Sequence, residues 1–389
     1  MNDEQPEPTP LATGGKRHRL ALVAGGTAIA LGIAAGGIGI GLALHPASDA
    51  TASRPATVQP AIRPWKYGNG SGSDSTPQTT SGTPATSAQK VGVVTIVSKL
   101  EYDGSSEAAG TGIILTRNGE ILTNNHVVEG ATSITVTVES TDTSYTAKVV
   151  GTDATDDVAV LQLVTSSGAK VSGLTAAAID ADTLAVGAAV TDVGNAEGTG
   201  DLVAASGTVA ALDRGIQVRD EISGDAKNLT GLIEVNADVV SGDSGGPLLD
   251  AQGEVTGMVT AASSGTRDVT GYAIPIATAV AIAKKIEAGA AGGSIVIGLP
   301  AFLGVELAAQ QSGSGVLLQD VIPGQAAQGA GLVGGDTITS VDGIAVGTPQ
   351  ALTAAITAHR PGDRVTLGYT DAAGASQQVA VALGEGPAA

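Results

Sequence analysis

The sequence predicts an all-β domain followed by a small α+β domain, with a transmembrane helix near the N-terminus. Three observations lead to this fold class. Residues 20–44 form an uninterrupted uncharged stretch, short runs of β-branched residues follow one another over residues 89–290, and further strand-like runs with two helical segments occupy residues 299–385. With 389 residues, of which 42% are hydrophobic, the chain is long enough to bury the cores of two domains.

The N-terminal apolar stretch is long enough to cross a membrane. Residues 20–44 carry no charge, and a helix needs about 20 such residues to span a bilayer. The preceding KRHR (residues 16–19) predicts that residues 1–19 stay in the cytoplasm and that residues 46 onward lie outside. The alternative is a cleaved signal peptide, whose apolar core is normally about 7–15 residues long. The length favours an uncleaved, single-pass anchor in the cell membrane.

The rest of the chain divides by composition. Residues 45–88 are rich in Pro, Ser, Thr and Gly and predict a flexible linker, because they cannot bury enough apolar surface to offset the entropy of ordering. Over residues 89–290, runs such as VGVVTIVS and VAVLQL alternate with turn residues, as in a barrel or sandwich. Residues 276–289 follow a proline and predict a closing helix. Residues 299–385 predict five strands and two helices.

Composition also excludes several kinds of site and partner. The chain has no Cys, which rules out a cysteine nucleophile, disulfides and Cys-ligated zinc or iron–sulfur centres. Its net charge of −19 argues against nucleic acid, because phosphates require a basic face. We expect neither a metal nor another cofactor.

Three residues of the β-rich domain predict nucleophilic catalysis. His126 is the one histidine between residues 89 and 290, and Asp157 begins a buried-looking strand 31 positions later. Ser244 lies in SGDSGGP, where small neighbours leave room for a substrate backbone. An imidazole held by a carboxylate can take the serine proton, and the N–H groups of Gly242 and Ser244 can form an oxyanion hole. The alternative for SGDSGGP is an ordinary Gly-rich turn.

The order of the three residues indicates the fold. His, then Asp, then Ser is the order of chymotrypsin, whereas subtilisin and α/β-hydrolases use other orders. An all-β domain of this size fits a double six-stranded barrel with the triad at the junction. The sequence therefore predicts a chymotrypsin-like serine endopeptidase that works through an acyl-enzyme at Ser244.

Longer motifs carry a family resemblance. TNNHVVEGA, DDVAVLQL, VGNAEG, GDSGGPLLD and GYAIPI occur in this order, and with them the chain resembles the HtrA/DegP family of trypsin-like serine proteases with a C-terminal PDZ domain, of the membrane-anchored actinobacterial type. The resemblance implies extracytoplasmic quality control or stress-response proteolysis of unfolded or misfolded polypeptides. An alternative is a PDZ-dependent peptide-binding sensor or chaperone in which proteolysis is secondary.

The resemblance also implies roles for the C-terminal domain. FLGV (residues 302–305) resembles the carboxylate-binding loop of a PDZ domain, with Leu303, Gly304 and Val305 supplying backbone donors. Such domains bind peptide C-termini by strand addition. Many relatives are trimers held by aromatic contacts, but this chain has a single Phe, so a homo-oligomer is neither required nor excluded.

Two aspartates depart from the family pattern. The family usually has Asn before the nucleophile, whereas this chain has Asp243, as in digestive proteases that pair this Asp with a new N-terminal amine. Asp238 stands six residues before Ser244, where trypsin-like enzymes have the floor of the S1 pocket. An Asp there selects Lys or Arg, whereas HtrA relatives select small aliphatic residues. The alternative for Asp238 is that it turns toward solvent or caps a loop.

Overall fold

The computed structural model describes residues 57–60, 82–100, 106–180, 182, 184–219, 226–262, 270–311 and 315–388. The predicted transmembrane segment, residues 20–44, lies outside these ranges. Within them, no helix combines the length and the apolar character needed to cross a bilayer.

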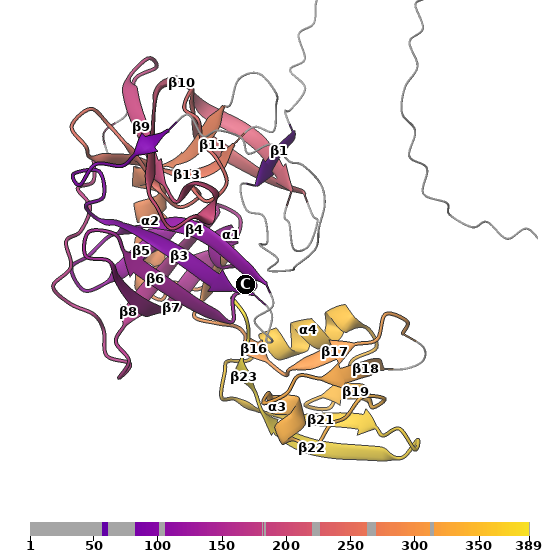
Figure 1. The fold of residues 1–389 in the computed structure, drawn as a ribbon. Coiled ribbons are helices and arrows are strands. Elements are labelled where there is room, and N and C mark those ends of the chain that lie inside the picture. The colour runs from indigo at the N-terminus through magenta and orange to yellow at the C-terminus, as the bar shows by residue number, and fades with distance from the viewer. Residues whose placement is uncertain are drawn as a thin grey trace, which may run out of the picture. The chain divides into compact units, whose positions relative to one another are not determined.

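The first folded unit of the β-rich region is a closed six-stranded barrel (Figure 1). Its strands are ordered β7-β6-β3-β4-β5-β8, and β7 also pairs with β8 to close the barrel. Alternating apolar side chains fill its interior, with Ile96, Ile121 and Leu161 completely buried. The strands are β3 (Val93–Lys99), β4 (Glu107–Ile114), β5 (Glu120–Thr123), β6 (Ser133–Val138), β7 (Thr143–Asp153) and β8 (Val158–Val164), with β15 (Ile295–Ile297) added to β7.

A second closed barrel follows in the chain. Its order is β10-β11-β14-β13-β12-β9, and β9 pairs with β10 to close it. Two closed barrels of six strands confirm the predicted chymotrypsin-like fold class for this domain. The strands are β9 (Ala189–Gly194), β10 (Val203–Arg219), β11 (Ala226–Val235), β12 (Pro247–Leu249), β13 (Val255–Ala262) and β14 (Gly271–Pro275).

One apolar cluster joins the two barrels. It combines Ile113 and Val158 of the first barrel with Met258 of the second. Helix α2 (Ile276–Glu287), which begins directly after Pro275, contributes Ile276, Ala279, Ile282, Ala283 and Ile286 to the same cluster. The helix therefore covers the junction, as the position of its apolar residues predicts.

The segment predicted to be a flexible linker contains two short strands. β1 (Thr57–Pro60) pairs with β10 and β13, and β2 (Thr83–Pro84) pairs with β10. Strand pairing uses backbone groups, so it does not require the apolar periodicity that this segment lacks. Part of the predicted linker therefore has regular structure.

The C-terminal domain is the predicted small α+β module. Its main sheet has the order β17-β18-β19-β21-β22, with β20 on β19, and β16 pairs separately with β23. β17 is an edge strand of this sheet. The elements are β16 (Ala301–Phe302), β17 (Val305–Leu307), β18 (Val316–Val321), α3 (Ala326–Gly329), β19 (Thr337–Val341), β20 (Ile344–Ala345), α4 (Pro349–Thr357), β21 (Arg364–Thr370), β22 (Ser376–Ala382) and β23 (Gly384–Glu385).

Candidate active site

The fold brings His126 and Asp157 into contact. His126 lies on the short helix α1 (Asn125–Val128), directly after β5, and Asp157 immediately precedes β8, the partner strand of β5. His126 Nδ1 is 2.8 Å from Asp157 Oδ2, and the His126 backbone N–H donates to Oδ1 over 3.1 Å. These two contacts orient the ring and leave Nε2 facing away from the carboxylate. The predicted base and its orienting acid are therefore paired.

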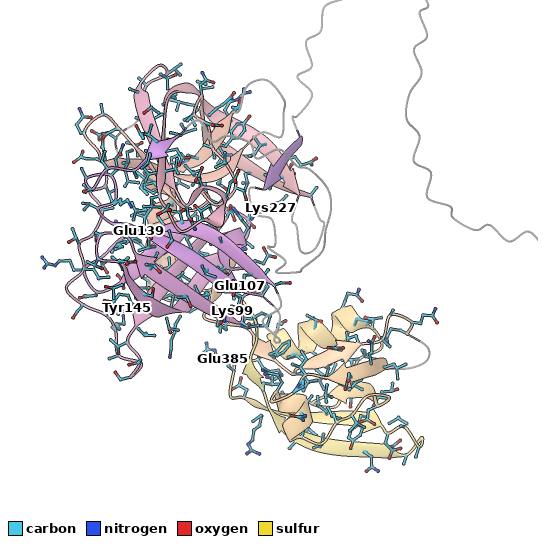
Figure 2. All side chains as sticks on the ribbon, viewed as in Figure 1. Lys99, Glu107, Glu139, Tyr145, Lys227 and Glu385 are labelled. Carbon is cyan, nitrogen blue, oxygen red and sulfur yellow. The ribbon has the colours of Figure 1, made fainter. Side chains whose placement is uncertain are left out.

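Asp157 is buried among groups that favour its charged form. Thr260 Oγ1 donates to Oδ2 over 2.6 Å, and Lys227, labelled in Figure 2, places Nζ 3.7 Å from Oδ1. Burial raises the pKa of Asp157, but His126, Lys227 and Thr260 together lower it to about 2. Asn124 Nδ2 donates to the backbone carbonyl of Asp157. This hydrogen bond holds the Asp157 backbone, whose φ is 57°. The carboxylate is thus ionised and fixed toward the imidazole.

Ser244 is fully buried, and its hydroxyl is not yet bonded to the imidazole. Its Oγ donates to the Thr260 carbonyl over 3.4 Å, while His126 Nε2 has no hydrogen-bond partner among the described residues. Catalytic hydrogen bonds are often long or absent without substrate.

The loop before Ser244 offers two unused backbone donors. In the described part of the chain, neither the N–H of Gly242 nor that of Ser244 donates a hydrogen bond. Gly242 has φ of 96°, and a side chain there would overlap the Asn195 carbonyl oxygen. Only glycine fits this position, which supports the oxyanion-hole role predicted from the sequence.

Thr111 links the first barrel to this loop and was missed by the sequence analysis. Its Oγ1 donates to the Gly242 carbonyl over 2.7 Å and accepts from the Asn195 N–H over 2.9 Å. Its backbone N–H donates to the Ser244 carbonyl over 2.9 Å. Nothing in TGIILT marks this threonine as different from other strand residues, because its partners lie far along the chain.

Replacing Thr111 by Val is expected to loosen the loop that carries Gly242 and Ser244. The valine keeps the shape of the side chain but removes its hydroxyl, so the Gly242 carbonyl and the Asn195 N–H lose their partner. This loss is expected to lower the free energy of unfolding by about 1–3 kcal/mol. We expect fluorophosphonate labelling of Ser244 to slow by about tenfold, which is about 1.4 kcal/mol on the activation barrier. Thr111→Ser retains the hydroxyl and is the control. Labelling of folded Thr111→Val at the wild-type rate would contradict this role.

Asp243 and Asp238 lie close to a third acid, Asp192 on β9. Asp243 is buried, and its side chain is hydrogen-bonded to that of Asp192. Asp238 is half-buried, and its charge raises the pKa of both other carboxyls. Asp192 was not singled out from the sequence.

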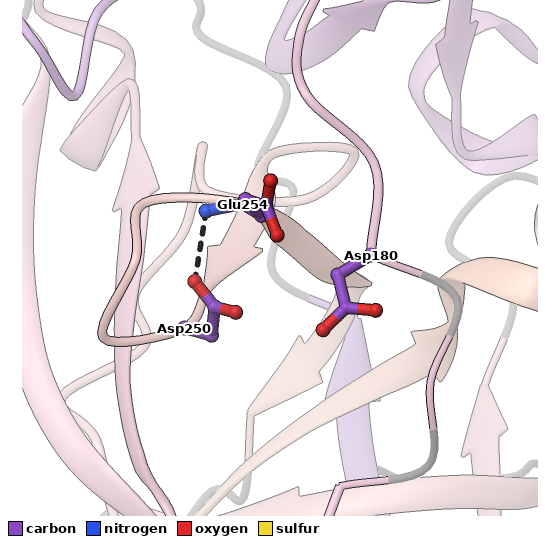
Figure 3. Close-up of side chains that lie close together, drawn as sticks. All are labelled: Asp180, Asp250 and Glu254. Atoms are coloured by element: carbon purple, nitrogen blue, oxygen red, sulfur yellow. Dashed lines mark hydrogen bonds between the residues drawn. The ribbon is translucent and has the colours of Figure 1, made fainter.

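Three carboxylates outside the triad form a separate acidic cluster. Carboxylate oxygens of Asp180, Asp250 and Glu254 are within 4.8 Å of one another, and all three residues are half-buried (Figure 3). Asp250 accepts the N–H groups of Gln252 and Glu254, which closes the turn between β12 and β13. These hydrogen bonds give Asp250 a structural role in the turn. We assign no catalytic role to the cluster.

The predicted carboxylate loop of the C-terminal domain lies beside the edge strand β17. Ala327 donates to the Leu303 carbonyl and Ile322 to the Gly304 carbonyl, which anchors the loop. Within the described ranges the N–H groups of Leu303 and Gly304 donate to no acceptor. Val305 begins β17 itself. The loop thus offers free donors next to a strand with an open edge.

Comparison with known proteins agrees with this architecture. Residues 110–258 match the family described as "Trypsin-like peptidase domain", and residues 301–383 match "PDZ domain". The chain is 34% identical over 276 residues to the "Periplasmic pH-dependent serine endoprotease DegQ" of Escherichia coli (strain K12). It is 32% identical over 314 residues to the "Serine protease PepD" of Mycobacterium tuberculosis.

These alignments cover different shares of the proteins compared. They include 67% and 75% of this chain, but only 56% of the first relative and 64% of the second. The chain thus spans less than two-thirds of the length of either relative. A solved structure, "HtrA-type protease AlgW with tripeptide", aligns with 78% of this chain and 98% of its own at 24% identity and a TM-score of 0.43.

Proposed function

We propose that this chain, which belongs to the HtrA family of serine proteases, is an endopeptidase whose nucleophile is Ser244. Its first folded domain is a trypsin-like serine protease domain and its second is a PDZ domain. One observation carries the proposal. A histidine bonded to an ionised, buried Asp157 lies in the same domain as Ser244, and among the described residues the N–H groups of Gly242 and Ser244 have no acceptor.

The proposed reaction uses these groups in turn. His126 Nε2 takes the proton from Ser244 Oγ as the oxygen attacks the scissile carbonyl, and Asp157 stabilises the imidazolium through Nδ1–H. The carbonyl oxygen becomes an oxyanion that the N–H groups of Gly242 and Ser244 stabilise. His126 then gives the proton to the leaving amine. Water, activated by the same imidazole, hydrolyses the acyl-enzyme.

The test is cleavage of casein by the wild-type chain and by Ser244→Ala. We expect cleavage by the wild type alone, because the alanine leaves binding surfaces in place and removes the nucleophile. If both proteins bound casein and neither cleaved it, the chain would be a binding protein.

We further propose an extracytoplasmic enzyme, anchored through residues 20–44, that cuts unfolded or misfolded polypeptides. The uncharged stretch after KRHR supports the anchor. The name "Periplasmic serine endoprotease DegP" of a 33% identical relative supports the compartment. Quality control or a stress response is the role that fits these substrates.

The topology can be tested on spheroplasts. Added protease is expected to digest residues 46–389 without lysis, because the positive charges before the anchor keep only the N-terminal tail inside. Immunoblots against tags at both ends measure this, and an N-terminal tag that persists in the membrane fraction distinguishes the anchor from a cleaved signal peptide. Detergent lysis is the control. Protection of the protease domain until lysis would reverse the assignment.

The PDZ domain is proposed to bind peptide C-termini along β17. Amidation of the peptide carboxylate is expected to weaken binding by at least tenfold, because hydrogen bonds to a charged group are worth about 1.5–3 kcal/mol. Calorimetry with the full-length Ser244→Ala chain avoids cleavage of the peptide. Acetylation of the other end of the peptide is the control and leaves affinity unchanged. Equal affinity for amidated and free peptides would point to internal sequences instead.

A further inference from the structure

Two buried carboxyl groups are bonded to each other beneath the nucleophile. Asp192 and Asp243 are 1% and 3% exposed, and their side chains share a hydrogen bond. Ionised carboxylates only accept hydrogen bonds, so such a contact requires a proton on one of them. Two like charges at contact in a buried site also disfavour ionisation of both.

The groups around Asp192 and Asp243 favour the protonated form of the pair. Burial, and then the charge and hydrogen bond of Asp243, hold the pKa of Asp192 well above its usual range, and burial raises the pKa of Asp243 to about 7. The charged group facing the pair is Asp238, which raises both pKa values further. No lysine, arginine or histidine in the described ranges forms an ion pair with Asp192 or Asp243.

The other contacts of the pair are few. Asp243 Oδ2 accepts the Val240 N–H over 2.9 Å. Oδ1 of Asp192 and Oδ1 of Asp243 are buried and accept no hydrogen bond from the N–H and O–H groups of the described residues. An unsatisfied buried carboxylate oxygen is costly, so a proton shared between the two groups is the contact that satisfies them.

The pair connects the loop to a rigid element. Asp192 is central in β9, where it pairs with Ala205 of β10 and Leu248 of β12. Asp243 lies between Gly242 and Ser244, the two residues whose N–H groups form the proposed oxyanion hole. A side chain at Gly194 would overlap Asp243, so the strand and the loop are in direct contact there. Movement of Asp243 would therefore displace both donors.

We propose that Asp192 is a positioning residue: its protonated carboxyl donates to Asp243 and thereby holds Gly242–Ser244 in the conformation that forms the oxyanion hole. The inference rests on the proposed function of Ser244. A neighbouring acid thus provides the hydrogen bond that digestive proteases obtain from an N-terminal amine. No chain cleavage is needed to form it.

The proposal has a consequence for the pH dependence. Both acids bind protons more tightly in the folded protein than in the unfolded chain, so folding stability falls as pH rises above about 4 and through the raised pKa values. When the shared proton is lost, two adjacent charges repel each other and also face Asp238. The loop is then released. We expect an alkaline limb in the reactivity of Ser244 that precedes global unfolding.

The test measures fluorophosphonate labelling of Ser244 in the full-length chain from about pH 5 to about pH 10. Asp192→Ala removes the donor and leaves Asp243 unpaired, so labelling at neutral pH is expected to fall by about 10–100-fold. Asp192→Asn provides a donor that does not titrate. It is expected to restore the labelling lost in Asp192→Ala and to move the alkaline limb to higher pH. Adding Asp243→Asn to Asp192→Ala is expected to recover part of the loss, because no charge is then buried.

Controls separate the possible failures. Asp336→Asn changes a buried carboxyl of the PDZ domain and is expected to label like the wild type. Circular dichroism at each pH verifies folding. If the wild type does not label, the proposed function fails. If the wild type labels and folded Asp192→Ala labels equally well, or Asp192→Asn keeps the wild-type alkaline limb, the positioning role is overturned.

An infrared difference spectrum gives a measurement that does not depend on activity. Wild type minus Asp192→Asn at neutral pH is expected to contain the band of a protonated carboxyl group. A carboxylate band in its place would overturn the proposal even if Asp192→Ala does not fold.

Discussion

Replacing Ser244 by Ala is expected to lower kcat against casein by about six orders of magnitude. His126→Ala is expected to cost nearly as much, and the double variant little more, because the triad residues act as a unit. The non-additivity follows from the proposed mechanism, in which His126 is useful only if it has a hydroxyl to deprotonate. Steady-state cleavage and fluorophosphonate labelling are the measurements.

The residual rate of these variants is also informative. With the Gly242 and Ser244 donors still present, about 10³–10⁴-fold acceleration over uncatalysed hydrolysis is expected to remain. Unfolding curves that coincide with the wild type are the control for both variants. Undiminished cleavage by Ser244→Ala would contradict the mechanism.

Replacing Asp238 by Ser is expected to change which bond is cut. We propose that the Asp238 carboxylate pairs with a Lys or Arg side chain before the scissile bond, because Asp238 stands six residues before Ser244, where trypsin-like enzymes have the floor of the S1 pocket. A Lys or Arg side chain in that pocket would gain an ion pair with this carboxylate that an apolar side chain cannot form, which supports discrimination of about 100-fold or more. The Asp238→Ser variant is expected to lose this preference.

Cleavage-site profiling on a denatured proteome measures the preference directly. Lys or Arg before most cuts in the wild type, and not in Asp238→Ser, is the expected outcome. Asp201→Ser is a matched control, since Asp201 is an exposed aspartate of the same domain. Cuts after Val, Ala or Ile by both proteins would remove Asp238 from the pocket and leave it a structural role.

Local pattern was sufficient to predict most of the architecture. Alternation of β-branched residues indicates strands because successive side chains point to opposite faces of a sheet, and Pro275 before an apolar 3.6-residue period indicates α2. The chain order of His126, Asp157 and Ser244 indicated a double barrel before any strand pairing was known. Composition did not indicate β1 and β2, which lie within residues 45–88 and pair with strands of the second barrel.

Residue type and chain order therefore determine the fold class of this protein and single out the residues proposed for catalysis, because a triad needs three particular side chains and each carries its own local motif. Only the tertiary structure determines which other residues position those groups. Thr111 contacts Gly242 across 131 positions of the chain, Thr260 contacts Asp157 across 103, and Asp192 meets Asp243 from another strand of the second barrel. Periodicity tells which face of a strand a residue occupies. Which residue it meets there depends on how the barrels close and on the register of their strands.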